Sequence, residues 1–566
     1  MTDDSFNIKK LNTKELLELS QEVRQKIIST CLKNGGHLGA SLGAVEIAIA
    51  LHRVFNSPVD SIIWDVGHQA YAHKIITDRW TSFDTLRTYG GLSGFLTPKE
   101  SPHDVFGAGH SSTAISAALG MSYKNKNWTI AVVGDGALSA GLAFEGLLNS
   151  VTLQDRGPLL IVINDNQQSI SQNVSSIRSL LATENAQLFF SCFNTQYVGP
   201  LDGNNLDLLL GTINGIKHNI ETNVINQVVI LHVYTQKGKG YFVAEERPTA
   251  YHGVGPAVIS KTKTEPDLKP KENHKTWSQA VSEMVFDRMK ADPKVVVITP
   301  AMTEGSELIK IQNSFPDRFF DVGIAEQHAV TFSAGLAAKG FKPYVFIYST
   351  FMQRALDQLI HDVAIQNLPV VFLVDRAGLV GQDGPTHHGV FDLVYTTMIP
   401  GLSVFSPQNG ADLKQIFKRD FNFPTVIRFP RGICEETDFE LKSTDESKNT
   451  HVVSIGCIGI KIEKILLKYN LKNIKHTRLI QVKPIEKDFL NNLVHEKINN
   501  YIFFEDGVGR GSVSEYLIAK ICEKKPIKAK IYAIPDQFIE HGKPADLEKL
   551  VGQDEVTLQK ILSSPV

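Results

Sequence analysis

The sequence has no marked excess of charge of either sign. Its 58 lysine and arginine residues stand against 60 aspartate and glutamate residues, which gives a net charge of −2 over 566 residues. Proteins that bind nucleic acid or an anionic membrane surface usually concentrate positive charge. We therefore expect neither a nucleic acid nor a membrane as a partner.

Cysteine is scarce and scattered. The five cysteines stand at positions 31, 192, 434, 457 and 522, and no two of them form a CxxC pair. This spacing predicts neither a zinc site nor a disulfide framework. It favours a reducing compartment, and we expect the cytoplasm.

Long apolar runs are also missing, since none approaches the length that spans a bilayer. The first fifteen residues, MTDDSFNIKKLNTKE, are polar and contain no apolar core, so we expect no signal peptide. What remains is an ordinary globular composition, 42% hydrophobic and 21% charged. The length predicts about two to four domains.

Apolar runs that read as strands alternate with helical patterns, which is typical of α/β domains. Ligands of open parallel sheets bind at the carboxyl ends of the strands, so candidate site residues are sought there. The expected strands fall within residues 128–137, 158–166, 224–235, 294–301, 342–350, 368–375 and 451–459.

Two polar stretches read as linkers between domains. Residues 259–275 are rich in Lys, Pro and Glu and have little to bury, and residues 441–450 form a shorter stretch of the same kind. They divide the chain into predicted domains at 1–258, 276–440 and 450–566.

The first motif is VVGDGALSAG (132–141), followed by VINDNQQSIS (162–171). Asp135 follows one expected strand and Asn166 ends the next, 31 residues later. A carboxylate, an amide oxygen and a backbone carbonyl form a hard oxygen set that suits Mg²⁺ bound beside a phosphate group. Gly134 and Gly136 would let the backbone approach a diphosphate. The alternative is a pair of ordinary Gly/Asp turns after strands.

Three histidines follow glycines in the first part of the chain: His37 in GGHLGASLG, His68 in WDVGHQAYAHK and His110 in GAGHSSTAIS. Imidazole suits proton transfer near neutral pH and hydrogen bonding to a diphosphate. A lone histidine is more often structural, and a metal-ligand role is weaker because no second ligand stands at short spacing.

A glutamate opens an apolar helical stretch, DVGIAEQHAVTFSAGLAAKG (321–340). A buried carboxylate is costly unless it is paired or holds a proton. Glu326 is therefore a candidate for a functional acid. The alternative is an acid favoured at a helix start by the helix dipole.

Further candidates lie at strand ends and in loops within residues 348–362, 375–392 and 427–432. Arginine suits bidentate phosphate binding better than lysine, although surface ion pairs are the alternative for any single arginine. Asp383 and His387 lie in a glycine-rich loop, and His388 is an equally placed rival of His387. The candidates outside that loop are Tyr348, Arg354, Arg376 and Arg431.

GDG followed about thirty residues later by Asn resembles the cofactor motif of thiamine diphosphate enzymes. Glu326 in GIAEQH matches the glutamate that hydrogen-bonds the cofactor's aminopyrimidine ring in those enzymes. Within them the chain resembles the 1-deoxy-D-xylulose-5-phosphate synthase family nearly end to end. The segments that carry this resemblance are IWDVGHQAY, GHSST, AEQHAVTF, YSTFMQRALDQ and DRAGLVGQDGPTH.

The resemblance implies site residues one by one. Mg²⁺ would be held by Asp135, Asn166 and the backbone carbonyl of Gln168. Residues that match cofactor contacts are His68, Gly109, His110, Ser111, Gly136, Ala137, Lys237 and Phe351, besides Glu326, which would activate the cofactor. The residues implied to handle protons and substrate oxygens are His37, His252, Arg354, Asp383 and His387, and those implied near the substrate phosphate are Tyr348, Arg376 and Arg431.

The resemblance also implies a reaction and an architecture. Pyruvate and D-glyceraldehyde 3-phosphate would condense with loss of CO₂, the first step of the methylerythritol phosphate route to isoprenoids, which also feeds thiamine and pyridoxal synthesis. The fold would be a transketolase-like α/β fold of three domains: a diphosphate domain, a pyrimidine domain and a C-terminal domain. A homodimer is implied as well. The alternatives are another thiamine diphosphate enzyme, such as a transketolase, and a non-catalytic cofactor-binding homologue.

One segment departs from the family pattern. SISQNV (169–174) reaches TQYVGPLDGNN (195–205) after only twenty residues, where family members usually carry a longer segment. The flanking motifs are intact, so we expect that a loop has been deleted and that the fold is retained. DGNN stands where the family has DGH, which puts one further family histidine in doubt. Closure over the reacting groups is expected to be altered.

Overall fold

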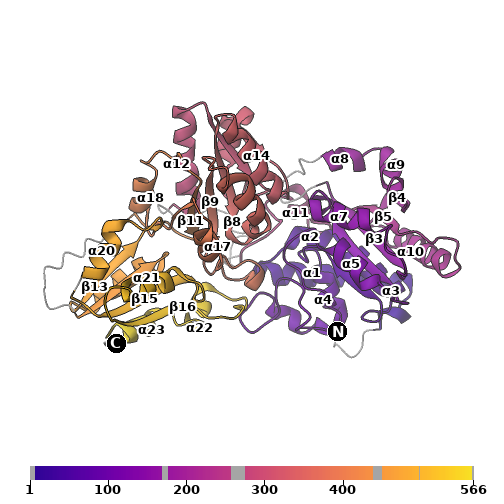
Figure 1. Ribbon diagram of the computed structural model, residues 1–566. Coiled ribbons are helices and arrows are strands. Elements are labelled where there is room, and N and C mark those ends of the chain that lie inside the picture. The colour runs from indigo at the N-terminus through magenta and orange to yellow at the C-terminus, as the bar shows by residue number, and fades with distance from the viewer. Residues whose placement is uncertain (1–6, 168–175, 257–274, 437–448, 496, 564–566) are drawn as a thin grey trace. The chain divides into compact units, whose positions relative to one another are not determined.

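The computed structural model describes residues 7–167, 176–256, 275–436, 449–495 and 497–563. The chain forms two compact units, the first built of residues 1–270 and 323–325 and the second of residues 271–322 and 326–566 (Figure 1). In the described part of the chain no helix combines the length and apolar character needed to cross a membrane. Whether the boundaries expected at 258, 276, 440 and 450 separate three domains stays a prediction.

The first unit is built on a five-stranded sheet in the order β1-β2-β3-β5-β4, and all its pairings are parallel. Its strands are β1 (Ser61–Trp64), β2 (Thr129–Gly134), β3 (Leu159–Asp165), β4 (Gln196–Asp202) and β5 (Val229–Tyr234).

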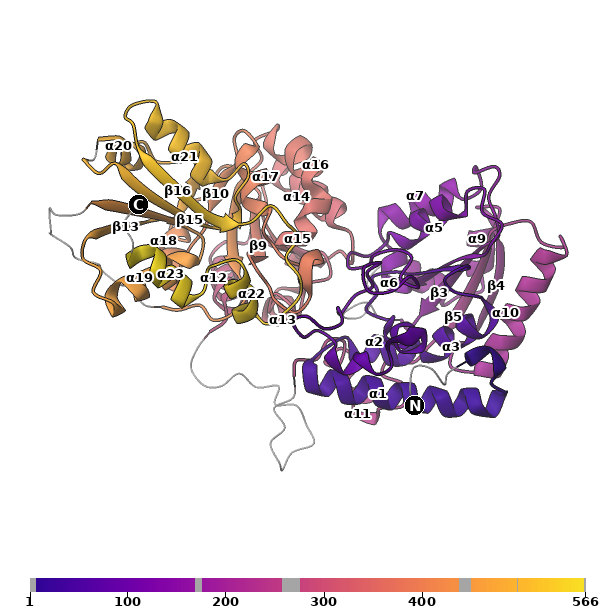
Figure 2. The same ribbon diagram turned by 90° about the horizontal axis from the view of Figure 1, so that it is seen from below.

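Helices cover both faces of this sheet, because residues that alternate along each strand point to opposite sides. Ile130 and Val132 of β2 pack in one core with α1 (Thr13–Asn34), α3 (Val45–Val54) and α10 (Leu206–Glu221). Ala131 and Val133 pack in another with α5 (Ala114–Ser122), α7 (Gly141–Asn149) and α9 (Asn185–Ser191). Figure 2 shows α1 and α3 on one side of the sheet and α5 and α7 on the other.

The second unit contains a seven-stranded sheet in the order β14-β10-β11-β9-β8-β6-β7. Tyr344 and Phe346 of β8 pack toward α12 (Trp277–Ala291), and Val345 and Ile347 pack toward α14 (Glu326–Ala338) on the other face (Figure 1). The strands are β6 (Val295–Thr299), β7 (Phe319–Asp321), β8 (Lys342–Tyr348), β9 (Val371–Ala377), β10 (Ser403–Phe405), β11 (Thr425–Pro430) and β14 (Gln481–Lys483).

A four-stranded parallel sheet, β13-β12-β15-β16, completes the second unit. Its faces are covered by α21 (Val513–Cys522) on one side and by α19 (Ile458–Lys468) and α23 (Glu555–Ser563) on the other. The strands are β12 (Thr450–Ile455), β13 (Ile474–Leu479), β15 (Asn500–Val508) and β16 (Lys528–Ile534).

Two features join the larger and smaller sheets of the second unit. Strand β14 follows β13 in the chain, yet it pairs antiparallel with β10 of the larger sheet. The fully buried Arg428 of β11 donates to Asp392, the first residue of α17 (Asp392–Met398), at 2.9 Å and to Asp506 of β15 at 2.7 Å. The α/β class with parallel sheets is therefore confirmed, and the predicted second and third parts share both a sheet and a buried ion cluster.

Candidate active site

The carboxyl edge of the first sheet collects four of the predicted cofactor residues. His68 follows β1, Asp135 follows β2, Asn166 follows β3 and Lys237 follows β5. Because these parallel strands are neighbours in the order β1-β2-β3-β5, the loops after them lie along one edge. Asp135 and Lys237 are buried there, and Asn166 is half-buried.

The predicted magnesium ligands follow adjacent strands. Gly134 of β2 pairs with Asn164 of β3, so Asp135 and Asn166 lie just past the last paired residues of the two strands. One carboxylate and one amide oxygen at such a place fit Mg²⁺, which takes few protein ligands and completes its shell with phosphate and water. Among the described residues no group of three or more His, Cys, Asp and Glu could hold a metal. The third predicted ligand, Gln168, lies outside the described residues.

Three histidines of the first unit form a cluster. The ring centroids of His37 and His68 are 5.9 Å apart, those of His37 and His252 5.8 Å, and those of His68 and His252 5.4 Å. Burial, and then the positive charge of Lys237, lower the pKa of His68 to about 4 and hold that of His252 well below its usual range. Both imidazoles are therefore neutral at pH 7.

The histidine cluster carries buried polar atoms that await a ligand. The Nδ1 atoms of His68 and His252 are buried and have no hydrogen-bond partner among the described residues. Unpaired buried polar atoms are costly and need an explanation, and a bound molecule supplies one. The residues present therefore fit a bound polar group. His37 stands just before α2 (Leu38–Gly43), and its backbone N–H donates to the Tyr71 hydroxyl at 3.1 Å.

The loop that carries Gly109, His110 and Ser111 is tied to the GDG turn. The Asp65 carboxylate, just past β1, accepts the backbone N–H groups of Ser112 at 2.8 Å and Ala114 at 3.2 Å. The Ser112 hydroxyl donates to the carbonyl of Ala137 at 2.7 Å. Sequence reasoning missed Asp65 and Ser112, although both lie within quoted motifs and Asp65 stands at a strand end.

Glu326 is the first residue of α14 and is 4% exposed. Burial raises the pKa of its carboxyl group, against the lowering effect of Arg354, whose Nη1 lies 3.3 Å from Oε2. The carboxylate thus stands at a helix start, as the helix-dipole alternative predicts, and it is also buried beside Arg354. This environment favours the protonated form more than water does.

Aromatic rings line the same part of the second unit. Phe351, in α15 (Ser349–Met352), stacks on Tyr348 with ring centroids 5.7 Å apart and planes 9° apart. On Phe351 the His387 ring makes an edge-on contact at 5.6 Å. Three of the predicted residues therefore form one aromatic group, and a flat ligand ring is the kind of partner that such a group suits.

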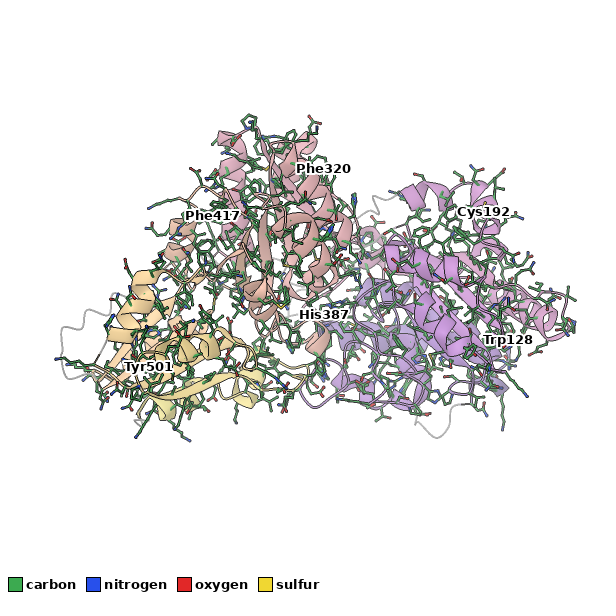
Figure 3. All side chains as sticks on the ribbon, in the orientation of Figure 1. Trp128, Cys192, Phe320, His387, Phe417 and Tyr501 are labelled. Atoms are coloured by element: carbon green, nitrogen blue, oxygen red, sulfur yellow. The ribbon has the colours of Figure 1, made fainter. Side chains whose placement is uncertain are left out.

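The two neighbouring histidines of the glycine-rich loop have different surroundings. His388 is buried, accepts the Val380 N–H at Nδ1 (3.1 Å) and lies 3.3 Å from the Glu540 carbonyl at Nε2. His387 is half-buried, with Nδ1 2.9 Å from the Thr386 hydroxyl. Figure 3 labels the position of His387. Asp383, in the same loop, is also half-buried. His388 is thus held between two backbone groups, and His387 stays the histidine of this loop predicted to meet the substrate.

Arg376 is held by protein groups on both Nη atoms. Nη1 donates to Ser278 Oγ at 3.2 Å and to Asp375 at 3.0 Å, and Nη2 donates to the Gly305 carbonyl and the Tyr348 hydroxyl. Its φ of +65° lies in the left-handed region. These four contacts use most of the N–H donors of the guanidinium, of which arginine has about five. Arg376 therefore holds Tyr348 in place, besides the phosphate contact predicted for it.

Arg431 is exposed just past β11, and its Nη1 lies 3.5 Å from the carbonyl oxygen of Val380. Its guanidinium is therefore less committed to protein groups than that of Arg376. Both arginines stay predicted contacts of the substrate phosphate.

The chain is similar in sequence to known protein families and to individual proteins. Residues 2–187 match the family model of 1-deoxy-D-xylulose-5-phosphate synthase, and residues 273–436 match that of the transketolase pyrimidine binding domain. The 1-deoxy-D-xylulose-5-phosphate synthase of Aquifex aeolicus (strain VF5) is 40% identical, over 98% of this chain and 96% of its own. That of Caldanaerobacter subterraneus subsp. tengcongensis is 39% identical over the same shares, and that of Cupriavidus metallidurans is 37% identical over 99% and 96%.

The chain belongs to the 1-deoxy-D-xylulose-5-phosphate synthase family. The alignment with the A. aeolicus synthase runs over 617 positions, 51 more (617 − 566) than this chain has residues. That relative of the synthase family therefore has residues that this chain lacks. That the missing residues belong after residue 174 stays a prediction, and residues 168–175 lie outside the described part of the chain.

Proposed function

We propose that this member of the synthase family condenses pyruvate with D-glyceraldehyde 3-phosphate, with loss of CO₂, to give 1-deoxy-D-xylulose 5-phosphate. Thiamine diphosphate and Mg²⁺ are the proposed cofactors. The observation that carries the proposal is Glu326, a buried carboxyl group with a raised pKa and a single cationic neighbour. Full-length similarity to synthases of this name supports the same conclusion.

When bound, thiamine diphosphate supplies the electron sink that lets the carboxylate of a 2-oxo acid leave as CO₂. Glu326 holds a proton toward the aminopyrimidine, and Arg354 keeps its carboxyl group oriented. The face of Phe351 offers the stacking surface. In the first unit, the residues proposed to contact the cofactor and its Mg²⁺ are His68, Gly109, His110, Ser111, Asp135, Gly136, Ala137, Asn166, Gln168 and Lys237.

The histidines of the first unit are proposed to take two roles. His68 and His252 present buried Nδ1 atoms, and burial, followed by the charge of Lys237, disfavours their charged forms, so they act as hydrogen-bond partners that do not gain charge at pH 7. His37, which stands beside them, is the proposed proton carrier of the first unit. His387 and Asp383 are proposed to hold the oxygens of the two substrates.

The phosphate of the aldehyde is proposed to bind Arg431, with Arg376 holding Tyr348 beside it. Arg376 stacks on the Tyr348 ring at 4.7 Å from its centroid and also bonds its hydroxyl. Gly305 is required for this arrangement, because a Cβ there would lie 2.1 Å from the Tyr348 hydroxyl. A phosphate monoester needs charge-assisted donors of this kind.

Three further proposals come from the family. The protein acts as a homodimer in the cytoplasm, and the parts 1–258, 276–440 and 450–566 correspond to diphosphate, pyrimidine and C-terminal domains. Light scattering on the purified protein tests the first of these, and a monomer at assay concentration would contradict it.

The experiment for the activity measures CO₂ release from pyruvate with thiamine diphosphate and Mg²⁺, with and without D-glyceraldehyde 3-phosphate. Release that accelerates with the aldehyde and yields a five-carbon ketose phosphate supports the synthase. Consumption of sugar-phosphate donors instead indicates a transketolase. Cofactor binding with no CO₂ release in either condition overturns the proposal and indicates a non-catalytic homologue.

A further inference from the structure

Three buried polar side chains run across the first sheet next to Asn166. Nε2 of His232 on β5 lies 3.1 Å from Oδ2 of Asp165 at the end of β3. Nδ1 of His232 lies 2.7 Å from the hydroxyl of Tyr197 on β4. The three strands are neighbours in the order β3-β5-β4, and the side chains are 3%, 0% and 8% exposed for Asp165, His232 and Tyr197. Such a chain must be satisfied throughout, because an unpaired member would be costly.

The direction of each hydrogen bond follows from the chemistry of the groups. An ionised carboxylate only accepts, so Nε2 of His232 carries the proton that faces Asp165. In a neutral imidazole Nδ1 is then the acceptor, and the Tyr197 hydroxyl donates to it. Burial raises the pKa of Tyr197 to about 12, so this hydroxyl keeps its proton at neutral pH.

Asp165, at one end of this hydrogen-bonded series, also contacts the loop after β3. The other oxygen of Asp165, Oδ1, accepts the backbone N–H of Gln167 at 2.9 Å. This side-chain bond closes a turn around Asn166, the residue between them. Gln167 has a φ of +60°, a left-handed conformation that a non-glycine residue adopts at some cost, and the bond from its N–H helps to hold it there.

On the other side of Asp165, Asn164 is held as well. Its Nδ2 donates to Gln69 Oε1 at 2.7 Å, and its Oδ1 accepts the Thr235 hydroxyl. Hydrogen bonds therefore hold the side chains of Asn164 and Asp165, which precede Asn166, and the backbone N–H of Gln167, which follows it.

We infer that Asp165, His232 and Tyr197 are positioning residues that orient the Asn166 amide for the divalent cation. None of the three needs to touch the metal. Without the donor from His232 the Asp165 carboxylate would have one buried oxygen unpaired and could turn away from the Gln167 N–H. The inference rests on the proposed function, because it takes Asn166 as a ligand of Mg²⁺.

The test measures Mg²⁺ affinity by isothermal titration calorimetry on apo protein with thiamine diphosphate present. Tyr197→Phe removes one hydroxyl and should weaken the apparent affinity for Mg²⁺ about threefold or more. His232→Gln should weaken it by roughly 10–100-fold, as is usual for residues behind a metal ligand. Excess Mg²⁺ should restore turnover in Tyr197→Phe, and a merely structural defect would not respond in this way.

Tyr234→Phe is the matched control. Tyr234 lies on β5, as His232 does, but its hydroxyl donates to the Leu181 carbonyl at 2.9 Å and makes no hydrogen bond to Asp165, His232 or Tyr197. Its Mg²⁺ affinity should equal that of the unchanged protein. Unchanged Mg²⁺ affinity in Tyr197→Phe would overturn the inference alone. Failure of the unchanged protein to bind Mg²⁺ with thiamine diphosphate would overturn the proposed function, and the inference with it.

Discussion

Replacing Glu326 by glutamine separates its chemistry from its place in the fold. Burial disfavours the charged form of this carboxyl group, so a neutral amide of the same shape removes a cost. The amide oxygen can still accept from Arg354, now 3.3 Å from the carboxylate. The hydrogen bond from Arg354 becomes weaker because its acceptor is no longer charged, whereas the cost of burying a charged group is removed. These two effects oppose each other, so we expect the free energy of unfolding to change by at most about 2 kcal/mol.

The effect on turnover should be far larger. Proton transfer by a positioned side chain contributes about 10²–10⁴-fold to a rate, which corresponds to roughly 2.7–5.4 kcal/mol of activation free energy. Glutamine can hydrogen-bond a ring nitrogen but cannot hold a proton there. CO₂ release by Glu326→Gln, with saturating cofactors and both substrates, should therefore fall at least about a hundredfold.

Glu505→Gln is the control for this measurement. Glu505 is 0% exposed on β15 and accepts from the backbone N–H and hydroxyl of Ser514, so the same chemical change is made at similar burial on a strand of the smaller sheet. Its turnover should be unchanged. The reasoning is refuted if Glu326→Gln, with thiamine diphosphate bound, keeps more than about a tenth of normal turnover. Equal losses in both variants would mean that a buried amide, and not the missing proton, is responsible.

Three further outcomes are expected. Arg431→Ala should raise the KM for D-glyceraldehyde 3-phosphate about tenfold or more and leave the KM for pyruvate unchanged in steady-state kinetics, because a charge-assisted bond is lost only to the phosphate. His388→Phe should lower the free energy of unfolding by about 1–3 kcal/mol in denaturant titrations with little effect on kcat, since the buried Val380 N–H loses its acceptor. His387→Gln should instead lower kcat and leave the free energy of unfolding nearly unchanged. Burial raises the pKa of Glu505 from 4.5 to about 7, so the folded protein holds a proton that the unfolded chain releases. Stability should therefore fall by roughly 3 kcal/mol as pH rises from about 4.5 to 7, and Glu505→Gln should flatten this slope in unfolding curves measured across that range.

The seven apolar runs singled out in the sequence each overlap a strand, because β-branched residues between turns favour the extended conformation; β9 continues past the run 368–375, and β12 begins one residue before the run 451–459. The run 224–235 was too long at its start: β5 begins only at Val229, after the polar residues Asn226 and Gln227. The other strands were not singled out; in β4, for example, Gly199 and Pro200 interrupt the apolar pattern.

Site residues at strand ends were predictable for a related reason. Parallel neighbouring strands bring their carboxyl ends to one edge, so Asp135 and Asn166 could be placed together from the sequence. The hydrogen bonds that Arg376 makes to other protein groups could not be predicted from the sequence. Its partners Ser278 and Gly305 are 98 and 71 residues away along the chain, and nothing in a local pattern reports such contacts.

Strand β14 sets where the chain can be cut. Its pairing with β10 covers what would otherwise be a bare sheet edge, and Arg428 needs Asp506 from beyond residue 450. A fragment that stops in the stretch 441–450 would expose that edge to other chains and leave a buried guanidinium short of one acceptor. Hybrids that exchange C-terminal parts between relatives should therefore carry β10, β11 and β14 from the same parent. The second unit should melt in a single cooperative transition.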